Sequence, residues 1–303
     1  MTASVTVTGT SRRPRGERLH ARRGSLGYTM PLVVVMGLTT LFPVGYAVYL
    51  SFFNWNWGNQ FQFVGLDNYR SLLTDPTFWA AMGRTGLFTV GAVVTELVLG
   101  MVLALAAQAT SWGVGILRSV LIIPLMVSGI IVSVIWKVML DPTLGVVPWA
   151  LDKLRLPVPD FLGSSGSALW TIVGIDAWWQ TAFVFIILNA GLAGLSNEPF
   201  EAAAADGANA WQRFRYITLP LMRPLIVTVA LIRMVDCLKV FAIIFGTTNG
   251  GPGRSTESAQ MLAYRSAFKE LAMSRSMTIM TIYAVLVIAL VGIVAFTQRK
   301  SSL

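Results

Sequence analysis

Residues 201–220 of the chain read EAAAADGANAWQRFRYITLP. This polar stretch lies between two long apolar stretches, and its run of alanines favours a short helix. Gly207 can end that helix, because a residue without a Cβ adopts a left-handed conformation freely. Leu219 and Pro220 then begin the next apolar stretch. The sequence therefore predicts a compact helical elbow, exposed between two membrane helices, that can dock into another protein.

The composition is that of an integral membrane protein. Of the 303 residues, 55% are hydrophobic and 12% are charged, whereas soluble domains carry roughly 25% charged residues. The mean hydropathy is +0.66, and a spanning helix needs about 20 mostly apolar residues. We therefore expect an all-α integral membrane protein with six transmembrane helices, at about 27–53, 85–108, 118–140, 168–193, 224–246 and 276–298.

The distribution of charge predicts how these helices are oriented. The net charge is +9, and a cluster of arginines precedes the first apolar stretch, which favours a cytoplasmic N-terminus and needs no nucleic-acid partner. That stretch is too long for a signal peptide and lacks a small-residue cleavage site. Six spans return the C-terminus to the cytoplasm. The predicted segments are a basic cytoplasmic tail at 1–26, a transmembrane domain at 27–298 with a cytoplasmic loop at 196–223, and a cytoplasmic C-terminus at 299–303.

Missing residue types exclude several classes of function. The single cysteine, Cys237, cannot form an internal disulfide, and one cysteine with one histidine, His20, is too little for a His/Cys zinc site. No G-x-x-x-x-G-K-[ST] motif occurs, so the chain does not hydrolyse ATP through a P-loop. No nucleophile–base arrangement stands out either. We expect a chain that is not an enzyme and that holds no metal or cofactor.

The segments expected outside the membrane differ in character. Residues 54–82 are rich in Trp and Phe, as the interfacial belt of a membrane protein is. Residues 141–167 contain several prolines and a Gly-Ser-Ser-Gly run, which predicts an irregular loop. Helical spacing within 258–275 predicts an amphipathic helix on the outer membrane surface. The apolar stripe of that helix is Tyr264, Phe268 and Leu271.

Two of the spans carry polar faces that predict a binding site. Ionisable residues inside a membrane are costly and are usually functional. On the fourth and fifth spans, four residues each share one helix face at i, i+3, i+4 and i+7 spacing. Carboxylates and a guanidinium can hydrogen-bond hydroxyl groups, and an aromatic ring can stack on the apolar face of a sugar. The candidate substrate-binding residues are Asp176, Trp179, Gln180, Phe183, Arg233, Asp236, Cys237 and Val240.

A structural role is open for some of these charges. Arg233 and Asp236 could form a buried ion pair that holds the fifth span in register. On the second span, Glu96, Gly100 and Ala104 stand four residues apart, which favours a close helix–helix contact with one buried acid paired to a polar partner. We prefer that role for Glu96 to contact with a substrate.

The elbow also resembles, position for position, the EAA loop of binding-protein-dependent ABC importer permeases. The matching positions are Glu201, Ala202, Ala203, Gly207, Ile217, Leu219 and Pro220. Further agreement with the maltose-type carbohydrate branch comes from the Asp-Gly-Ala run at 206–208, the Thr-Leu-Pro run at 218–220, and the segments at 63–69 and 247–253.

This resemblance implies a type I ABC importer permease fold, in the cell membrane of a prokaryote, and transport of a disaccharide, an oligosaccharide or a polyol. Counted from the EAA glutamate and the Gly-Gly-Pro turn, the eight candidate positions match those where maltose-type permeases contact sugar. In the family, two permeases pair, and a sister chain is expected here. Two ATP-binding cassette subunits bind ATP and Mg, and an extracytoplasmic binding protein delivers the sugar. The implied ATPase-coupling residues are Glu201, Ala202, Ala203, Ala204, Asp206, Gly207 and Ala208.

Two alternatives stay open at this point. An ion-coupled secondary transporter or a channel would have the same hydropathy and could use Glu96, Asp176 and Asp236 for coupling, although it would not need an ATPase dock. Within the ABC interpretation, Arg233 permits an anionic substrate such as glycerol phosphate, which Asp176 and Asp236 oppose.

Overall fold

The computed structural model describes residues 15–110 and 113–301, so residues 1–14 of the predicted basic tail lie outside the described residues. The chain divides into two compact units, Met1–Leu50 and Ser51–Leu303. The first unit consists of helix α1, Arg15–Ser51. Its apolar part, Met30–Ser51, is long enough to cross a membrane. The helix begins inside the segment that the sequence predicted to be a tail.

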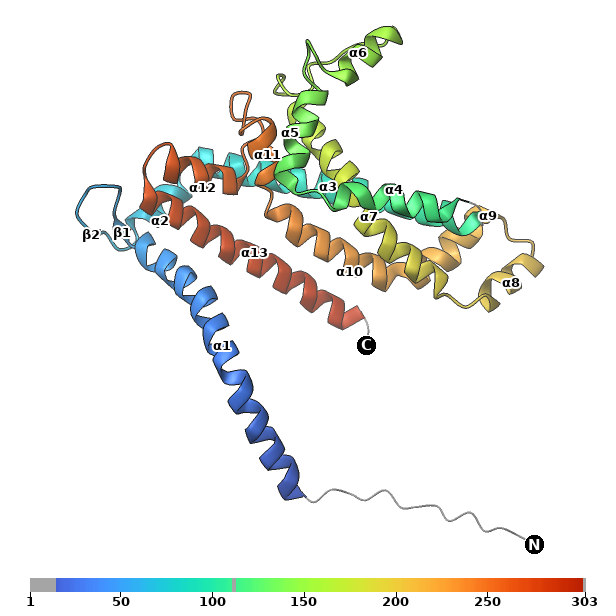
Figure 1. Ribbon diagram of the computed structural model, residues 1–303, viewed down its shortest axis with the longest axis horizontal. Helices are drawn as coiled ribbons and strands as arrows, with labels where there is room; N and C mark the ends of the chain where they lie inside the picture. The colour runs from blue at the N-terminus through green and yellow to red at the C-terminus, as the bar shows by residue number, and fades with distance from the viewer. Residues whose placement is uncertain (1–14, 111–112, 302–303) are drawn as a thin grey trace. The chain divides into compact units, whose positions relative to one another are not determined.

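The second unit holds the remaining elements, which Figure 1 shows in chain order. A two-stranded antiparallel hairpin pairs Phe53 with Phe63. The elements are β1 Phe53–Asn54, β2 Gln62–Phe63, α2 Asp67–Leu73, α3 Pro76–Ala109, α4 Val114–Leu125, α5 Gly129–Met139, α6 Val146–Lys153, α7 Ala168–Ala193, α8 Glu198–Ala205, α9 Ala210–Arg213, the π-helical turn η1 Phe214–Thr218, α10 Leu219–Leu238, α11 Ala242–Thr247, α12 Ala259–Phe268 and α13 Met273–Ser301.

Helices α3, α7 and α10 pack against one another and form the centre of this unit (Figure 1). The predicted small-residue contact on α3 is confirmed. Glu96, Gly100 and Ala104 are all buried. A Cβ on Gly100 would lie 2.6 Å from Cγ1 of Val184 on α7, so only glycine permits this approach of the two helices.

The number of spans is confirmed only in part. Among the described residues, four helices are long and apolar enough to cross a membrane, and a bent pair of helices makes a fifth candidate. These four candidate spans lie in α1, α3, α7 and α13. Helix α10 has 20 residues but carries Arg223, Arg233 and Asp236, which lower its hydropathy. A span at α10, which would bring the number to six, therefore stays a prediction.

The segment expected to span at 118–140 is not one straight helix, because α4 and α5 meet at a bend of 98°. Pro124 lies in the last turn of α4 and lacks an N–H donor. The carbonyl of Val127 in the break accepts a hydrogen bond of 3.1 Å from the indole N–H of Trp179. Gly129, the first residue of α5, lies so close to the same ring that a Cβ would come within 2.8 Å of it. The Trp179 side chain of α7 thus supplies a hydrogen bond to a carbonyl in the break and packs against its backbone.

The helix expected over 224–246 is likewise not continuous. Helix α10 begins at Leu219 and ends at Leu238, and α11 begins after a gap of three residues. Two carbonyls freed by this break are satisfied by distant side chains: Tyr283 donates to Leu238, and Ser258 donates to Val240 over 3.0 Å. Interrupted helices at membrane depth are tolerated where the protein itself supplies such partners.

The segments that the sequence places outside the membrane are more ordered than it indicates. Residues 141–167 include the helix α6. The predicted amphipathic helix exists as α12, but it ends at Phe268, and Leu271 adopts a left-handed conformation with φ of 55°. Its buried face holds Met261 and Leu262 and packs on α13. Phe268 is exposed, so the predicted stripe is not the packed face.

The start of α3 lies earlier than the predicted position 85. Asp75 caps the helix by accepting from the backbone N–H of Thr77 at 2.8 Å, and its carboxylate also pairs with Arg275 at the start of α13. Burial raises the pKa of Asp75, but these hydrogen bonds and the nearby guanidinium outweigh it, and the pKa falls below its ordinary value. This pair ties the start of α3 to the start of α13.

Candidate functional site

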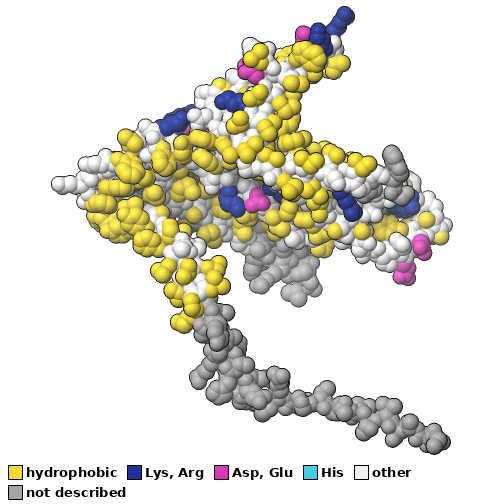
Figure 2. All heavy atoms as spheres, in the orientation of Figure 1, with side chains coloured by type: hydrophobic (Ala, Val, Ile, Leu, Met, Phe, Trp, Pro, Cys, Tyr) yellow, Lys and Arg dark blue, Asp and Glu magenta, His cyan; other side chains and the backbone are white. Residues whose placement is uncertain are grey.

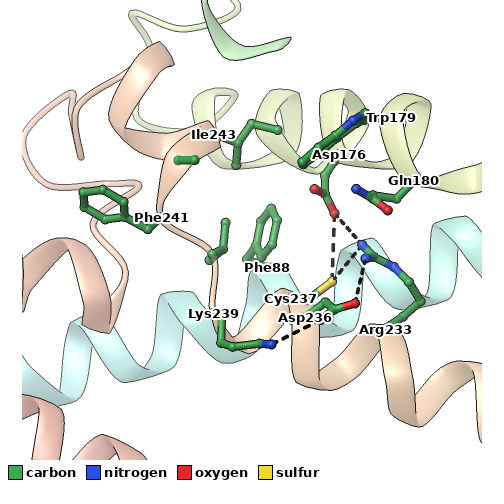
Figure 3. Close-up of a pocket in the computed structure, with 12 residues that line it drawn as sticks. Phe88, Asp176, Trp179, Gln180, Arg233, Asp236, Cys237, Lys239, Phe241 and Ile243 are labelled. Atoms are coloured by element: carbon green, nitrogen blue, oxygen red, sulfur yellow. Dashed lines mark hydrogen bonds and ion pairs between the residues drawn. The ribbon is translucent and has the colours of Figure 1, made fainter. Parts of the chain in front are cut away.

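A cavity of about 260 Å³ lies where α7 faces the break between α10 and α11. Figure 3 shows the acid and amide side chains of α7 and the charged side chains of α10 pointing toward one another across it. The lining residues are Phe88, Asp176, Trp179, Gln180, Arg233, Asp236, Cys237, Lys239, Val240, Phe241, Ala242 and Ile243. We call this cavity the chamber.

The chamber brings together seven of the eight predicted substrate-binding residues. Phe183 is the exception: it lies two turns along α7 from Asp176 and packs around the apolar cluster that contains Met101 and Phe185. Helical spacing placed it on the same face, but the chamber does not extend that far along the helix.

The strongest interactions of the chamber gather on Arg233, which is 4% exposed. Its Nε donates to Oε2 of Glu96 at 2.5 Å, and its Nη2 donates to Oε1 of the same carboxylate at 2.9 Å. Nη2 also donates to Oδ2 of Asp176 at 3.0 Å. The three side chains come from α10, α3 and α7. They form a buried charged cluster that joins the three central helices.

Asp236 has a different environment from the other two acids. Its side chain is 48% exposed, and it lies 3.7 Å from Nη1 of Arg233 and 3.3 Å from Nζ of Lys239. The pairing of Arg233 with Asp236 that the sequence left open is thus the longest of the contacts that Arg233 makes with carboxylates. Asp236 is therefore the acid of this group whose carboxylate is most exposed to the chamber.

Glu96 is the partner that sequence reasoning did not identify for Arg233. It is fully buried on the small-residue face of α3 and pairs with a polar group, as expected, but 137 residues separate the two. Lys239 was also missed. Because α10 ends at Leu238, Lys239 leaves the helical register and faces the chamber. Phe88 and Phe241 add ring surfaces from α3 and from the break.

The chamber combines hydrogen-bonding groups with apolar ring surfaces. Carboxylate oxygens of Asp176 and Asp236 and the amide of Gln180 provide hydrogen-bonding groups. Rings of Trp179 and Phe88 provide apolar surface. Glu96, Asp176 and Cys237 hold possible metal-ligating atoms within 4.8 Å of one another. Arg233 already donates to all three, so a guanidinium occupies the place that a metal ion would need.

The predicted elbow is present between α7 and α10. Helix α8 ends at Ala205, and Gly207 just beyond it takes the expected left-handed conformation, with a φ of +77°. The N–H of Ala208 donates to the carbonyl of Ala203, and the N–H of Gly207 donates to that of Ala204, which is the Schellman pattern of a helix end. Asn209 and Gln212 then form a capping box at the start of α9. The elbow is therefore two short helices with a defined turn between them.

The seven predicted coupling residues lie on or beside this turn, and most are exposed. Figure 2 shows acidic side chains at the tip formed by α8, while apolar side chains cover much of the face over α3 and α4. Asn197 stands at the N-cap position of α8, but its side chain makes no capping hydrogen bond. The hydroxyl of Ser196 instead accepts from the N–H of Glu198 at 3.4 Å.

Comparison with known proteins gives consistent results. Residues 96–300 match the family described as the inner membrane component of binding-protein-dependent transport systems. A probable ABC transporter permease protein, y4oQ of Sinorhizobium fredii, is 35% identical over 96% of this chain and 94% of its own length. The trehalose/maltose transport system permease protein MalF of Thermococcus litoralis is 35% identical over 82% of this chain and 85% of its own. The trehalose transport system permease protein SugA of Mycobacterium tuberculosis is 31% identical over 94% and 90%.

A solved structure has the same fold. A chain of a bacterial ABC transporter involved in the import of the acidic polysaccharide alginate superposes with a TM-score of 0.80, at 22% identity, over 93% of this chain and 99% of that one. This chain therefore shares its overall fold with that chain.

Proposed function

This chain belongs to the family of binding-protein-dependent transport system inner membrane components, and from that premise we propose that it forms part of the sugar-conducting pore of an ABC importer. A member of this family is a non-catalytic permease subunit, and no cofactor is expected in it. The ion-coupled transporter considered from the sequence is not adopted. The proposed substrate is a disaccharide, an oligosaccharide or a polyol, which the trehalose and maltose permeases among its relatives support.

The observation that carries the substrate class is the chamber. Polar positions selected by helical spacing on two separate spans converge on one cavity, beside aromatic rings. Asp236 offers exposed carboxylate oxygens there, and the indole N–H of Trp179 is taken by Val127, which leaves the face of its ring for stacking. The proposed partners are a sister permease, two ATP-binding cassette subunits that bind ATP and Mg, and an extracytoplasmic sugar-binding protein.

Substitution of Asp236 tests the sugar site. Removing a charged acceptor from a bound hydroxyl costs about 1.5–3 kcal/mol, or about one to two decades in affinity. Sugar uptake by proteoliposomes with Asp236→Asn should therefore fall steeply at low substrate concentration. Basal ATP hydrolysis and complex assembly should survive, because Arg233 keeps Glu96 and Asp176 as partners.

Asp152→Asn is the matched control, since Asp152 is exposed on α6 and does not line the chamber. It should leave uptake unchanged. If the assembled Asp236→Asn complex takes up sugar at low concentration as well as the wild type does, Asp236 accepts no hydrogen bond from the sugar and the proposed sugar site is wrong.

We further propose that α10 is the sixth span and that both termini and the elbow are cytoplasmic. The charges of α10 support this proposal, because Arg233 is paired within the protein and does not face lipid. Arg223 lies near the end of α10 that joins the elbow, where a long basic side chain can reach the membrane surface.

Cysteine labelling tests this orientation. In a Cys237→Ser background, a cysteine at Ala210 of α9 should react with a membrane-impermeant maleimide only after the cells are opened. A cysteine at Gln60 of the hairpin should react in intact cells. Both positions are exposed, and the background protein alone measures unspecific reaction. The reverse pattern would overturn the orientation, and the proposed ATPase dock with it.

A further inference from the structure

The guanidinium of Arg233 is almost completely engaged inside the protein, although Arg233 lines the chamber. Glu96 accepts hydrogen bonds from Nε and from Nη2, and Asp176 accepts a second hydrogen bond from Nη2. Glu96 is fully buried and does not itself line the chamber. Breaking these contacts would cost much free energy, because it would leave a buried charge unpaired.

The other base of the chamber is also paired. Nζ of Lys239 lies 3.3 Å from Asp236. Counting the charged groups of the chamber and of its buried cluster, three acids (Glu96, Asp176 and Asp236) face two bases (Arg233 and Lys239). The excess of carboxylates would therefore repel an anionic solute, and both bases are already paired with acids of the protein. The hydroxyls of an uncharged solute would instead find carboxylate oxygens that accept hydrogen bonds.

We propose that Glu96 sets the charge selectivity of the chamber: by holding the guanidinium of Arg233, it makes the chamber accept uncharged sugars and reject sugar phosphates and uronates. This inference rests on the proposed function as a sugar-conducting subunit. Glu96 is a positioning residue, since it acts through Arg233 and touches no solute itself.

The variant Glu96→Gln separates this role from packing. Glutamine keeps the size of the side chain and removes its charge, so Nε of Arg233 loses its carboxylate partner and Nη2 keeps only that of Asp176. A phosphate or a uronate can then form charge-assisted hydrogen bonds with the guanidinium. The affinity for an anionic sugar, relative to that for its uncharged counterpart, should rise roughly ten- to hundredfold.

The experiment measures equilibrium binding to the purified complex of this chain with its partner subunits. The probes are radiolabelled trehalose and maltose, displaced by their unlabelled forms or by trehalose 6-phosphate and maltose 6-phosphate. The wild-type complex should bind the uncharged sugars and reject the phosphates, and Glu96→Gln should bind the phosphates measurably. Retained rejection by an assembled Glu96→Gln complex would overturn the inference. Failure of the wild type to bind any of the four sugars would instead count against the sugar site itself, and with it this inference.

Glu257→Gln is the matched control. Glu257 is also a fully buried glutamate paired with an arginine, at 3.0 Å from Nε of Arg265, but it lies in the outer segment after α11 and away from the chamber. It should leave the ratio of the two affinities unchanged. If Glu96→Gln does not assemble, Asp176→Asn decides the matter, because it releases Nη2 of Arg233 on the side of the chamber. An unchanged ratio in that variant would overturn the inference as well.

Discussion

Replacing Arg233 by methionine should prevent assembly of the protein. Methionine fills much of the same volume but leaves the buried carboxylates of Glu96 and Asp176 without their cation. Removing one partner of a buried ion pair typically costs about 3–5 kcal/mol, which is a large part of the stability of most proteins. The measurement is the yield of monodisperse complex on size-exclusion chromatography in detergent, together with its melting temperature.

Arg223→Met is the control for this prediction. Arg223 lies on the same helix, is exposed, and has no ion pair among the described residues, so its loss should leave the yield near that of the wild type. Adding Glu96→Gln to Arg233→Met should restore a large part of the assembly, because the most deeply buried charge is then gone. Normal assembly of the single Arg233→Met variant would show that the cluster does not hold the three helices together.

Gly207→Asp should uncouple the proposed transporter while the protein still inserts. A Cβ at this position meets no atom within 4 Å, so no internal clash is expected. The φ of +77° disfavours a side chain, and a negative charge at the C-terminal end of α8 opposes the helix dipole. The distorted, charged turn should no longer fit a cleft on an ATPase subunit. ATP hydrolysis stimulated by the binding protein should fall to the basal rate.

Gly113→Asp provides the comparison for this variant. Gly113 also has a positive φ, +82°, and open space around the position of a Cβ, but it lies outside the elbow, before α4. Stimulation should survive there if the effect at Gly207 is specific to docking. Equal stimulation in the wild type and in Gly207→Asp would remove the proposed dock from this turn.

The structure confirms features that depend on neighbours in sequence. The end of α8 at Gly207 follows from a local backbone requirement, and the close approach at Gly100 follows from the spacing of small residues on one helix. The same holds for Asp176 and Arg233, since residues at i, i+3, i+4 and i+7 share a helix face wherever the helix is packed. Such features need no knowledge of the partner helix.

The two broken spans could not be predicted in this way. Apolar residues lie on both sides of Met126 and of Lys239, so hydropathy averaged along the sequence predicts a continuous helix across each of these positions. The breaks are stable because distant side chains, Trp179 and Tyr283 among them, donate to the carbonyls that the helices release. The end of α10 then turns Lys239 into the chamber, and the length of the chamber leaves Phe183 outside it.

The sequence by itself determined the membrane class, the family, the elbow and the two polar faces, because each is written in composition or in spacing along one segment. Only the tertiary structure decided which charge neutralises which. Three acids were within reach of Arg233 in principle, and helical spacing favoured Asp236. The guanidinium bonds instead to Glu96, 137 residues away, which is fully buried on α3, the helix that packs against both α7 and α10. A buried charge requires a partner of opposite sign. Here the partner is close in the folded structure but distant in the sequence.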